Sequence, residues 1–334
     1  MGALFVGVDG GGTSTRCVVV TESGEIAGRG RAGGANAISV PDPAANLRSA
    51  LLGALEGLDR ALIAGGVFGL AGAARAAEPA ERAWREAGLA GRPAVVADVL
   101  VAFTGATEEP DGAVLVAGTG AIGARVRDRR IVRRADGLGW LLGDEGSGVW
   151  LGRRAAAAAL NAIDGRGEPT VLVARVAEAV LGAGAAGEDD GPALAQALVG
   201  AVYARVAELG PAWLGTLAPV VDAAAREGDE VARGVVAEAA RRLCRTARVV
   251  TGGAARDRGA RAAGDGGPLV LAGSLLTEPT ELAHLVRAEL GRRARLVRAR
   301  DAAAGAAALA VRAALPGDPR AAEAHRALIR QGGA

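Results

Sequence analysis

Lysine is absent from this chain of 334 residues, so all 39 of its basic residues are arginines. Without lysine, the protein can form no Schiff base with a substrate and has no P-loop lysine to hold a phosphate. Histidine is also scarce, with only His284 and His325 present. We therefore expect acid–base chemistry in this protein to fall to aspartate or glutamate.

Cysteine is equally rare. Cys17 and Cys244 lie among apolar residues, and neither has a CxxC partner. This pattern predicts buried thiols in a reducing compartment, with no disulfide and no metal cluster. No apolar run approaches the roughly 18 residues that a membrane span needs, and the N-terminus shows no targeting signal. We expect a cytoplasmic protein with no membrane partner.

A strong charge of one sign is missing as well, since the net charge is only +2. The arginine clusters at residues 125–134 and 287–300 alternate with apolar residues or acids, and aromatic residues are not interleaved with them. We interpret these clusters as solvated faces and expect no nucleic-acid partner.

Glycine is abundant, and its most informative use is in residues 4–20. An apolar run ends at Asp9, passes through Gly10, Gly11, Gly12 and Thr13, and resumes as a second apolar run containing Thr15. Such a strand–turn–strand can aim several backbone N–H groups at one anion. The missing lysine and the missing helix exclude a P-loop and a dinucleotide fingerprint. The turn predicts a site for a metal-bound polyphosphate, with an ordinary glycine-rich hairpin as the alternative.

The same pattern returns at residues 113–126, where an apolar run turns through Gly118, Thr119 and Gly120 into another. This half-chain repeat predicts a duplicated α/β architecture, with domains at residues 1–112 and 113–334. The last predicted helix, capped by Asp301, consists mainly of alanine and glycine, which suits close packing. This helix can pack back on the first domain. Two such turns facing each other across a cleft can hold one polyphosphate from both sides.

Three further segments carry polar groups at the ends of predicted elements. A strand at residues 94–97 ends at Asp98, which can be a general base or a plain helix cap. The loop at residues 136–148 contains Trp140, and its Asp and Ser can simply cap the alanine-rich helix that follows. A strand at residues 269–272 ends in Gly273 and Ser274. Near the start of the chain, Asp42 predicts a helix whose leucine stripe runs from Leu47 to Leu62, and residues 67–70 predict a buried strand.

Taken together and in this order, these motifs resemble the N-acetylglucosamine kinase branch of the BadF-type ATPase family, in the actin-like sugar-kinase superfamily. The motifs are Asp-Gly-Gly-Gly-Thr at 9–13, Ala-Asp at 97–98, Ala-Gly-Thr-Gly at 117–120, Gly-Trp at 139–140, Gly-Asp-Glu-Gly-Ser at 143–147 and Ala-Gly-Ser at 272–274. The resemblance covers nearly the whole chain. It implies two actin-like, ribonuclease H-like domains with a nucleotide and sugar cleft between them.

The resemblance also implies roles for individual residues. It implies that ATP is bound by Gly10, Gly11, Gly12, Thr13, Thr15, Gly118, Thr119, Gly120, Gly273 and Ser274. It implies that the sugar is bound by Asn36, Asp98, Thr119, Trp140, Gly143, Asp144 and Ser147. Asp98 matches the catalytic base, and Asp9 matches the residue that holds Mg²⁺, in our interpretation through water.

The function implied is phosphorylation of N-acetylglucosamine by ATP with Mg²⁺, on the 6-hydroxyl, in a protein expected from the family to be a homodimer. A kinase for another amino sugar, such as glucosamine or N-acetylmuramic acid, is one alternative. A non-kinase ATPase of the same fold is another, either an iron–sulfur activator or a regulator. The activator needs cluster cysteines in the second domain, where Cys244 stands alone.

Overall fold

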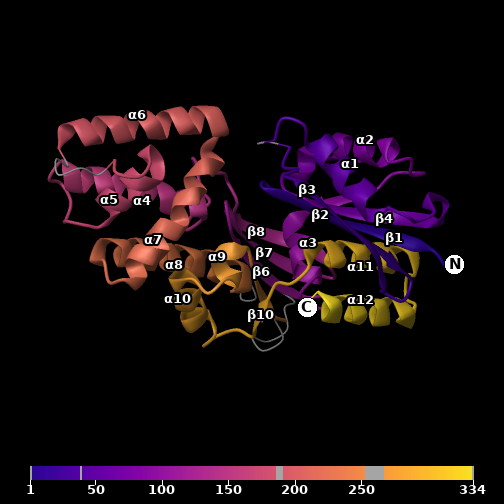
Figure 1. The fold of residues 1–334 in the computed structure, drawn as a ribbon. Coiled ribbons are helices and arrows are strands. Elements are labelled where there is room, and N and C mark those ends of the chain that lie inside the picture. Colours follow the sequence, from indigo (N-terminus) through magenta and orange to yellow (C-terminus); the bar gives the residue numbers. More distant parts are fainter. Residues whose placement is uncertain (1, 38–39, 186–190, 253–266, 333–334) are drawn as a thin grey trace.

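The computed structural model describes residues 2–37, 40–185, 191–252 and 267–332, and within them two five-stranded mixed sheets (Figure 1). Sheet A has the order β3-β2-β1-β4-β5 and sheet B the order β10-β9-β6-β7-β8. The strands of sheet A are β1 Leu4–Gly10, β2 Ser14–Thr21, β3 Ile26–Gly33, β4 Ile63–Leu70 and β5 Ala94–Ala97. Those of sheet B are β6 Gly112–Ala117, β7 Ala121–Arg127, β8 Arg130–Asp136, β9 Leu269–Ala272 and β10 Leu296–Arg298.

The two sheets share one topology. In sheet A, β1 pairs antiparallel with β2 and parallel with β4; in sheet B, β6 pairs antiparallel with β7 and parallel with β9. Each sheet is therefore an antiparallel three-stranded meander extended by two parallel strands from later in the chain. The two-domain α/β fold predicted from the repeated strand–turn–strand is confirmed.

Helices lie between and after the strands along the chain. In the first half these are α1 Pro43–Ala54, α2 Ala77–Glu86 and α3 Asp98–Thr104, with 3-10 turns η1 Arg60–Leu62 and η2 Ala73–Arg75. The second half contains α4 Gly148–Ile163, α5 Leu172–Leu181, α6 Pro192–Leu209, η3 Pro211–Leu217, α7 Ala218–Arg226, α8 Glu230–Thr251, α9 Ser274–Thr277, α10 Glu281–Leu290, α11 Ala302–Ala314 and α12 Pro319–Gln331. Among the described residues, none of these helices has the length and apolarity to cross a lipid bilayer.

Two predicted boundaries in the first domain were wrong. Asp42 caps α1 as expected, by accepting the N–H of Ala45, but the helix ends at Ala54, and Leu62 closes a separate 3-10 turn. Gly57 has φ +71° just beyond the helix, a left-handed conformation that does not continue an α-helix. The strand expected at residues 67–70 begins earlier, at Ile63, because it pairs with β1 along its length.

Two arginines of the cluster at residues 125–134 form hydrogen bonds within the protein, although we expected the whole cluster to be a solvated face. The cluster lies on the β7–β8 hairpin, and β8 itself was not predicted. The Arg125 guanidinium donates to the carbonyls of Val250 and Thr251, and that of Arg129 donates to Glu108 O. Arg133 and Arg134 are exposed, as a solvated face requires.

Helix α3 lies between the two sheets. Val101 packs in a cluster with Phe5 and Val67 of sheet A. Val99 and Phe103 pack instead in a cluster with Val114 and Val270 of sheet B. The first residue of α3 is Asp98, so the packing of this helix fixes the position of that carboxylate at the junction of the domains.

Helix α11 packs beside α3 on the same face of sheet A, away from α1 and α2 (Figure 1). A Cβ atom added at Gly7 of β1 would lie 2.2 Å from Ala303 O, and one added at Gly305 would lie 2.3 Å from Val101 O. The glycines therefore allow backbone-to-backbone contact between α11, β1 and α3. The C-terminal helices α11 and α12 thus pack in the same cluster as strands β1 and β2.

Helix α12 is tied to α3 by His325, whose side chain is fully buried. The Nε2 atom lies 2.6 Å from Thr104 O, and Nδ1 accepts from Arg312 Nε at 3.1 Å. A ring nitrogen that accepts carries no proton, so the ring is neutral and Nε2–H is the donor. Burial lowers the pKa of His325 from 6.5 to about 4, with the Arg312 charge adding to the shift.

Because Gly305 is closely packed, we predict that two glycine-to-alanine substitutions in helices have opposite effects on the stability of the fold. Gly305→Ala should destabilise the fold by about 2 kcal/mol or more, because the new methyl group overlaps the backbone of α3. Gly234→Ala, on the exposed side of α8 with no atom within 4 Å, should stabilise it by about 0.5–1 kcal/mol. Urea denaturation measures both. Equal effects would contradict the described packing of α11.

His325 predicts an acid-dependent loss of stability. Its pKa is lower in the folded protein than in the unfolded chain, so between pH 6.5 and about 4 the unfolded chain binds more protons. Stability is complete above pH 6.5 and falls as the pH drops, by roughly 2 kcal/mol at pH 5. Urea denaturation at pH 7 and pH 5 should show a smaller difference for His325→Gln than for wild type. The control His284→Gln, at an exposed position on α10, should keep the wild-type difference.

Candidate active site

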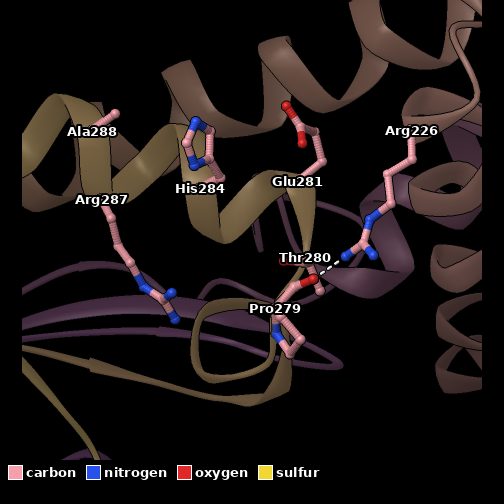
Figure 2. A pocket seen from close by; sticks show the side chains of 7 residues that line it. All are labelled: Arg226, Pro279, Thr280, Glu281, His284, Arg287 and Ala288. Atoms are coloured by element: carbon pink, nitrogen blue, oxygen red, sulfur yellow. Dashed lines mark hydrogen bonds between the residues drawn. The ribbon is translucent and has the colours of Figure 1, made fainter.

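The hollow beside α10 contains none of the nucleotide-, sugar- or metal-binding residues predicted from the sequence (Figure 2). Its arginines already bind protein groups: Arg226 donates to Pro279 O and pairs with Asp222, and Arg287 donates to Leu276 O. We therefore build the candidate site from the two glycine turns and the carboxylates around them.

The first turn joins β1 to β2. It is closed by a hydrogen bond from Gly11 N–H to Ser14 O, 3.0 Å long. Gly12 and Thr13 are exposed at its tip, where their N–H and hydroxyl groups can reach a ligand. Thr15 is fully buried, and its hydroxyl donates to Gly33 O at 2.7 Å. Thr15 thus joins the turn to the loop after β3.

That loop places Asn36 beside the first turn. Ala35 N–H donates to Gly11 O at 2.9 Å. Gly34 packs so closely that an added Cβ would lie 2.2 Å from Gly12 O. The half-buried Asn36 follows directly, so the structure brings the predicted sugar residue next to the predicted phosphate turn.

Asp9 stands at the end of β1, opposite Arg16 of β2, and the two form an ion pair of 3.0 Å. The pKa of Asp9 is raised to about 6, because burial and the nearby charges of Asp98 and Asp301 raise it by more than Arg16 lowers it. Three carboxylates therefore influence one region of the first domain. A divalent cation would relieve their repulsion.

Among the described residues, no group of three or more His, Cys, Asp or Glu side chains is arranged to hold a metal ion directly. Mg²⁺ keeps several of its waters in proteins and binds through one or two carboxylates plus substrate phosphates. The single carboxylate of Asp9 beside the turn fits that mode of binding. It does not form an all-protein cage.

Asp98 begins α3 immediately after β5, and its Oδ1 accepts the N–H of Val99 at 2.9 Å. Burial raises the pKa of Asp98, whereas the Val99 N–H and the charge of Arg134 lower it. The carboxylate is thus both a helix-end acceptor and a group with increased basicity. A general base needs such increased basicity.

The second turn rests on the start of α4. Gly118 N–H donates to Gly120 O, and the carbonyls of Gly118 and Thr119 accept the N–H groups of Gly148 and Val149 at 2.7 and 3.3 Å. Ser147 is fully buried and caps α4 by accepting the N–H of Trp150. The capping interpretation of Ser147 is confirmed.

Asp144 lies against the second turn. An added Cβ at Gly120 would lie 2.9 Å from Asp144 Oδ2. The pKa of Asp144 is raised by burial and by Asp136, and lowered by the N–H of Ala121. Asp136 in turn accepts the N–H groups of Asp144 and Glu145, both at 2.8 Å.

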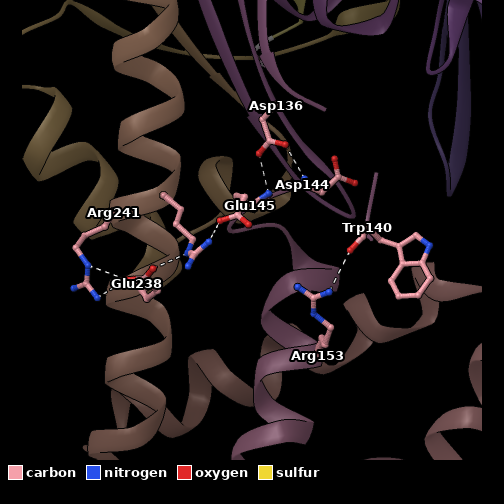
Figure 3. Close-up of polar contacts among 8 residues, drawn as sticks. Asp136, Trp140, Asp144, Glu145, Arg153, Glu238 and Arg241 are labelled. Atoms are coloured by element: carbon pink, nitrogen blue, oxygen red, sulfur yellow. Dashed lines mark hydrogen bonds and ion pairs between the residues drawn. The ribbon is translucent and has the colours of Figure 1, made fainter. Parts of the chain in front are cut away.

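The loop between Asp136 and Asp144 is strained and apolar at its tip. Both aspartates have positive φ, +64° and +53°, a conformation uncommon outside glycine. Gly143 is required because an added Cβ would lie 2.4 Å from Asp136 Oδ1. Trp140 is 38% exposed, so it is not a core tryptophan, and its carbonyl accepts from Arg153 (Figure 3).

Gly273 adjoins the second turn from the other side. It has φ +83°, and an added Cβ would lie 2.2 Å from Ala117 O, so only glycine fits there. Ser274 begins the short helix α9. The third predicted nucleotide element is therefore in contact with the strand end that leads into Gly118.

Two residues near the site were missed from sequence. Asp136 supports the Asp144 loop, but its role depends on hydrogen bonds that no local pattern reveals. Arg134, whose charge acts on Asp98, was grouped with the solvated arginines. The sequence feature that could have indicated both Asp136 and Arg134 is their position at the start of the glycine-rich loop.

The two sheets of matching topology define a protein of the actin-like fold class. The chain belongs to the BadF/BadG/BcrA/BcrD ATPase family, whose model matches residues 6–310. A curated relative is the N-acetylmuramic acid/N-acetylglucosamine kinase of Clostridium acetobutylicum, 37% identical over 107 residues. That match spans 31% of this chain and 35% of the relative.

Solved structures share this fold over more than nine-tenths of the chain. A protein from Chromobacterium violaceum, provisionally named an N-acetylglucosamine kinase, is 26% identical with a TM-score of 0.66, covering 93% of this chain and 99% of that one. A ROK family glucokinase from Streptomyces griseus is 21% identical with a TM-score of 0.56, covering 92% and 99%. The latter similarity supports the fold alone.

The loop geometry predicts that Asp136→Asn loosens the segment that carries Asp144. Asparagine has a single acceptor oxygen and can keep only one of the two N–H bonds. Hydrogen exchange at the Asp144 and Glu145 amides should become about tenfold faster. Asp128→Asn, at another positive-φ aspartate in the β7–β8 turn, is the control and should leave those amides unchanged. Unchanged exchange in Asp136→Asn would contradict this role.

Proposed function

We propose that this protein is an ATP-dependent kinase that phosphorylates an amino sugar, most directly N-acetylglucosamine on its 6-hydroxyl. The observation that carries the proposal is the position of Asp98. This carboxylate begins the helix between the sheets and interacts electrostatically with Asp9 beside the first glycine turn. In the proposal, Asp98 is the base, the turn after Asp9 binds the polyphosphate and the neighbouring loop of Asn36 binds the sugar; the closeness of these three segments supports it.

In the proposed reaction, the exposed tip of the first turn and the second turn hold the phosphates of ATP. Gly273 and Ser274 lie beside the adenosine. Mg²⁺ bound with ATP neutralises phosphate charge, and Asp9 is the residue that would hold it through water. Thr15 and Ser147 act by positioning, because their hydroxyls already bond Gly33 O and Trp150 N–H.

The sugar is proposed to lie between Asn36 in the first domain and the Asp144 loop in the second. Asp144 and Asn36 can accept hydrogen bonds from sugar hydroxyls, and the exposed Trp140 ring can pack on an apolar sugar face. Asp98 accepts the proton of the attacking hydroxyl as the new O–P bond forms and the bond from phosphorus to ADP breaks. The names of the relatives support an amino sugar as the acceptor.

The cysteines give no support to the iron–sulfur activator alternative. Cys17 and Cys244 are buried in different hydrophobic clusters, one in each domain. Burial raises the pKa of both thiols, that of Cys244 to about 11. A metal cluster binds thiolates, which such an environment disfavours.

The proposal predicts that Asp98→Asn abolishes sugar-dependent ADP release. Asparagine can still accept the Val99 N–H, so the fold should persist, but it cannot accept the hydroxyl proton. Turnover with Mg-ATP and N-acetylglucosamine should fall by about 100-fold or more. Asp318→Asn, at the cap of α12, is the matched control and should keep wild-type turnover.

The same assay tests the acceptor by comparing N-acetylglucosamine with N-acetylmannosamine, N-acetylmuramic acid, glucosamine and glucose. ADP release above the basal rate with one amino sugar supports the proposal and identifies the substrate. If none of the sugars raises ADP release in wild type, the sugar-kinase proposal fails.

A further inference from the structure

Arg134 lies on the face of sheet B that packs against α3. It stands opposite Ala124 in the antiparallel β7–β8 ladder, and directly opposed residues place their side chains on the same face. Ala124 is fully buried in the cluster that contains Val99 and Phe103 of α3. Arg134 occupies the edge strand of this sheet and is itself exposed.

The neighbouring Arg133 belongs to the opposite face. It stands opposite Arg125, whose guanidinium donates to Val250 O and Thr251 O of α8. Gly123, on that same face, packs against Thr246 of α8. The strand register therefore separates two adjacent arginines, one toward α3 and the domain junction and the other toward the side covered by α8.

The charged groups around Asp98 come from both domains. Asp9 and its ion-pair partner Arg16 belong to the first domain, and Asp301, at the start of α11, acts on Asp9 and pairs with Arg29. Arg134 is the group from the second domain whose charge acts on Asp98. Arg16 and Arg29 already pair with carboxylates, which leaves their charge partly neutralised.

Phosphoryl transfer needs positive charge at the reacting centre. As the sugar oxygen attacks and the bond from phosphorus to ADP breaks, negative charge spreads over the transferring oxygens. The chain has no lysine. Several turn N–H groups are already bonded within the protein, those of Gly11, Gly118 and Gly148 among them. An arginine is the remaining type of side chain able to supply a permanent charge there.

We propose, on the basis of the function proposed above, that Arg134 is a catalytic residue that reaches across the domain junction to the transferring phosphoryl group. The sugar hydroxyl gives its proton to Asp98, the phosphoryl group moves to the sugar oxygen, and ADP leaves with the electron pair of the broken bond. Arg134 donates to the phosphoryl oxygens during this step. Because it comes from the second domain, the reacting centre is complete only when the two domains meet around the substrates.

The test compares wild type with Arg134→Gln, Arg134→Lys and the matched control Arg133→Gln, by steady-state ADP release with Mg-ATP and the sugar that wild type accepts. We expect Arg134→Gln to lower kcat by about 100-fold or more with little change in KM. Arg134→Lys should recover part of the loss, since it keeps the charge but not the planar fork. Arg133→Gln should behave as wild type.

A binding measurement separates catalysis from structure. Isothermal titration with the sugar present should give Arg134→Gln the wild-type affinity for Mg-ADP. The extra affinity that aluminium fluoride confers on Mg-ADP in wild type, as a mimic of the transferring phosphoryl group, should be lost in that variant. A structural role would instead weaken both.

The results that would overturn the inference are distinct from those that overturn the proposed function. Wild-type kcat in Arg134→Gln, an equal loss in Arg133→Gln, or loss of Mg-ADP binding in Arg134→Gln each reject the role of Arg134 while the kinase stands. A wild type with no sugar-dependent ADP release rejects the proposed function, and the role of Arg134 with it.

Discussion

The close packing of α11 against β1 and α3 is the contact on which the site depends. Gly7 and Gly305 have no side chain that would hold these backbones apart, and the alanines of α11 fill the remaining space. Helix α3 is thereby fixed between two sheets that are far apart in the sequence. Asp98 is its first residue, so the position of one carboxylate follows from packing that involves the beginning, the middle and the end of the chain. His325, bonded to Thr104 O at the other end of α3, extends the same arrangement to α12.

The electrostatics of the junction follow from what the chain lacks. With no lysine, the carboxylates Asp9, Asp98 and Asp301 are compensated by arginines and backbone N–H groups. That compensation is incomplete, because the pKa values of Asp9 and Asp98 are both raised above the ordinary value. Such a junction favours a divalent cation with a polyphosphate, and it makes Asp98 a stronger base than an exposed aspartate.

Local features could be predicted from sequence, whereas features that depend on distant residues could not. The two glycine turns and the caps at Asp42, Ser147 and Asp301 were predicted, because each depends on residues close in sequence. Strand β8 was not, because its arginines hide the apolar alternation of a strand. The bond of Thr15 to Gly33 O and the support of Asp144 by Asp136 are tertiary contacts. Family motifs indicated which residues belong together but not which of them position others.

The most direct test of the central claim is ³¹P NMR of the products formed by wild-type protein from Mg-ATP and N-acetylglucosamine. The account predicts that the γ-phosphate signal of ATP is replaced by a phosphomonoester resonance split by the two protons at C6 of the sugar. Growth of inorganic phosphate alone, or an unchanged ATP spectrum with every amino sugar tried, would contradict it.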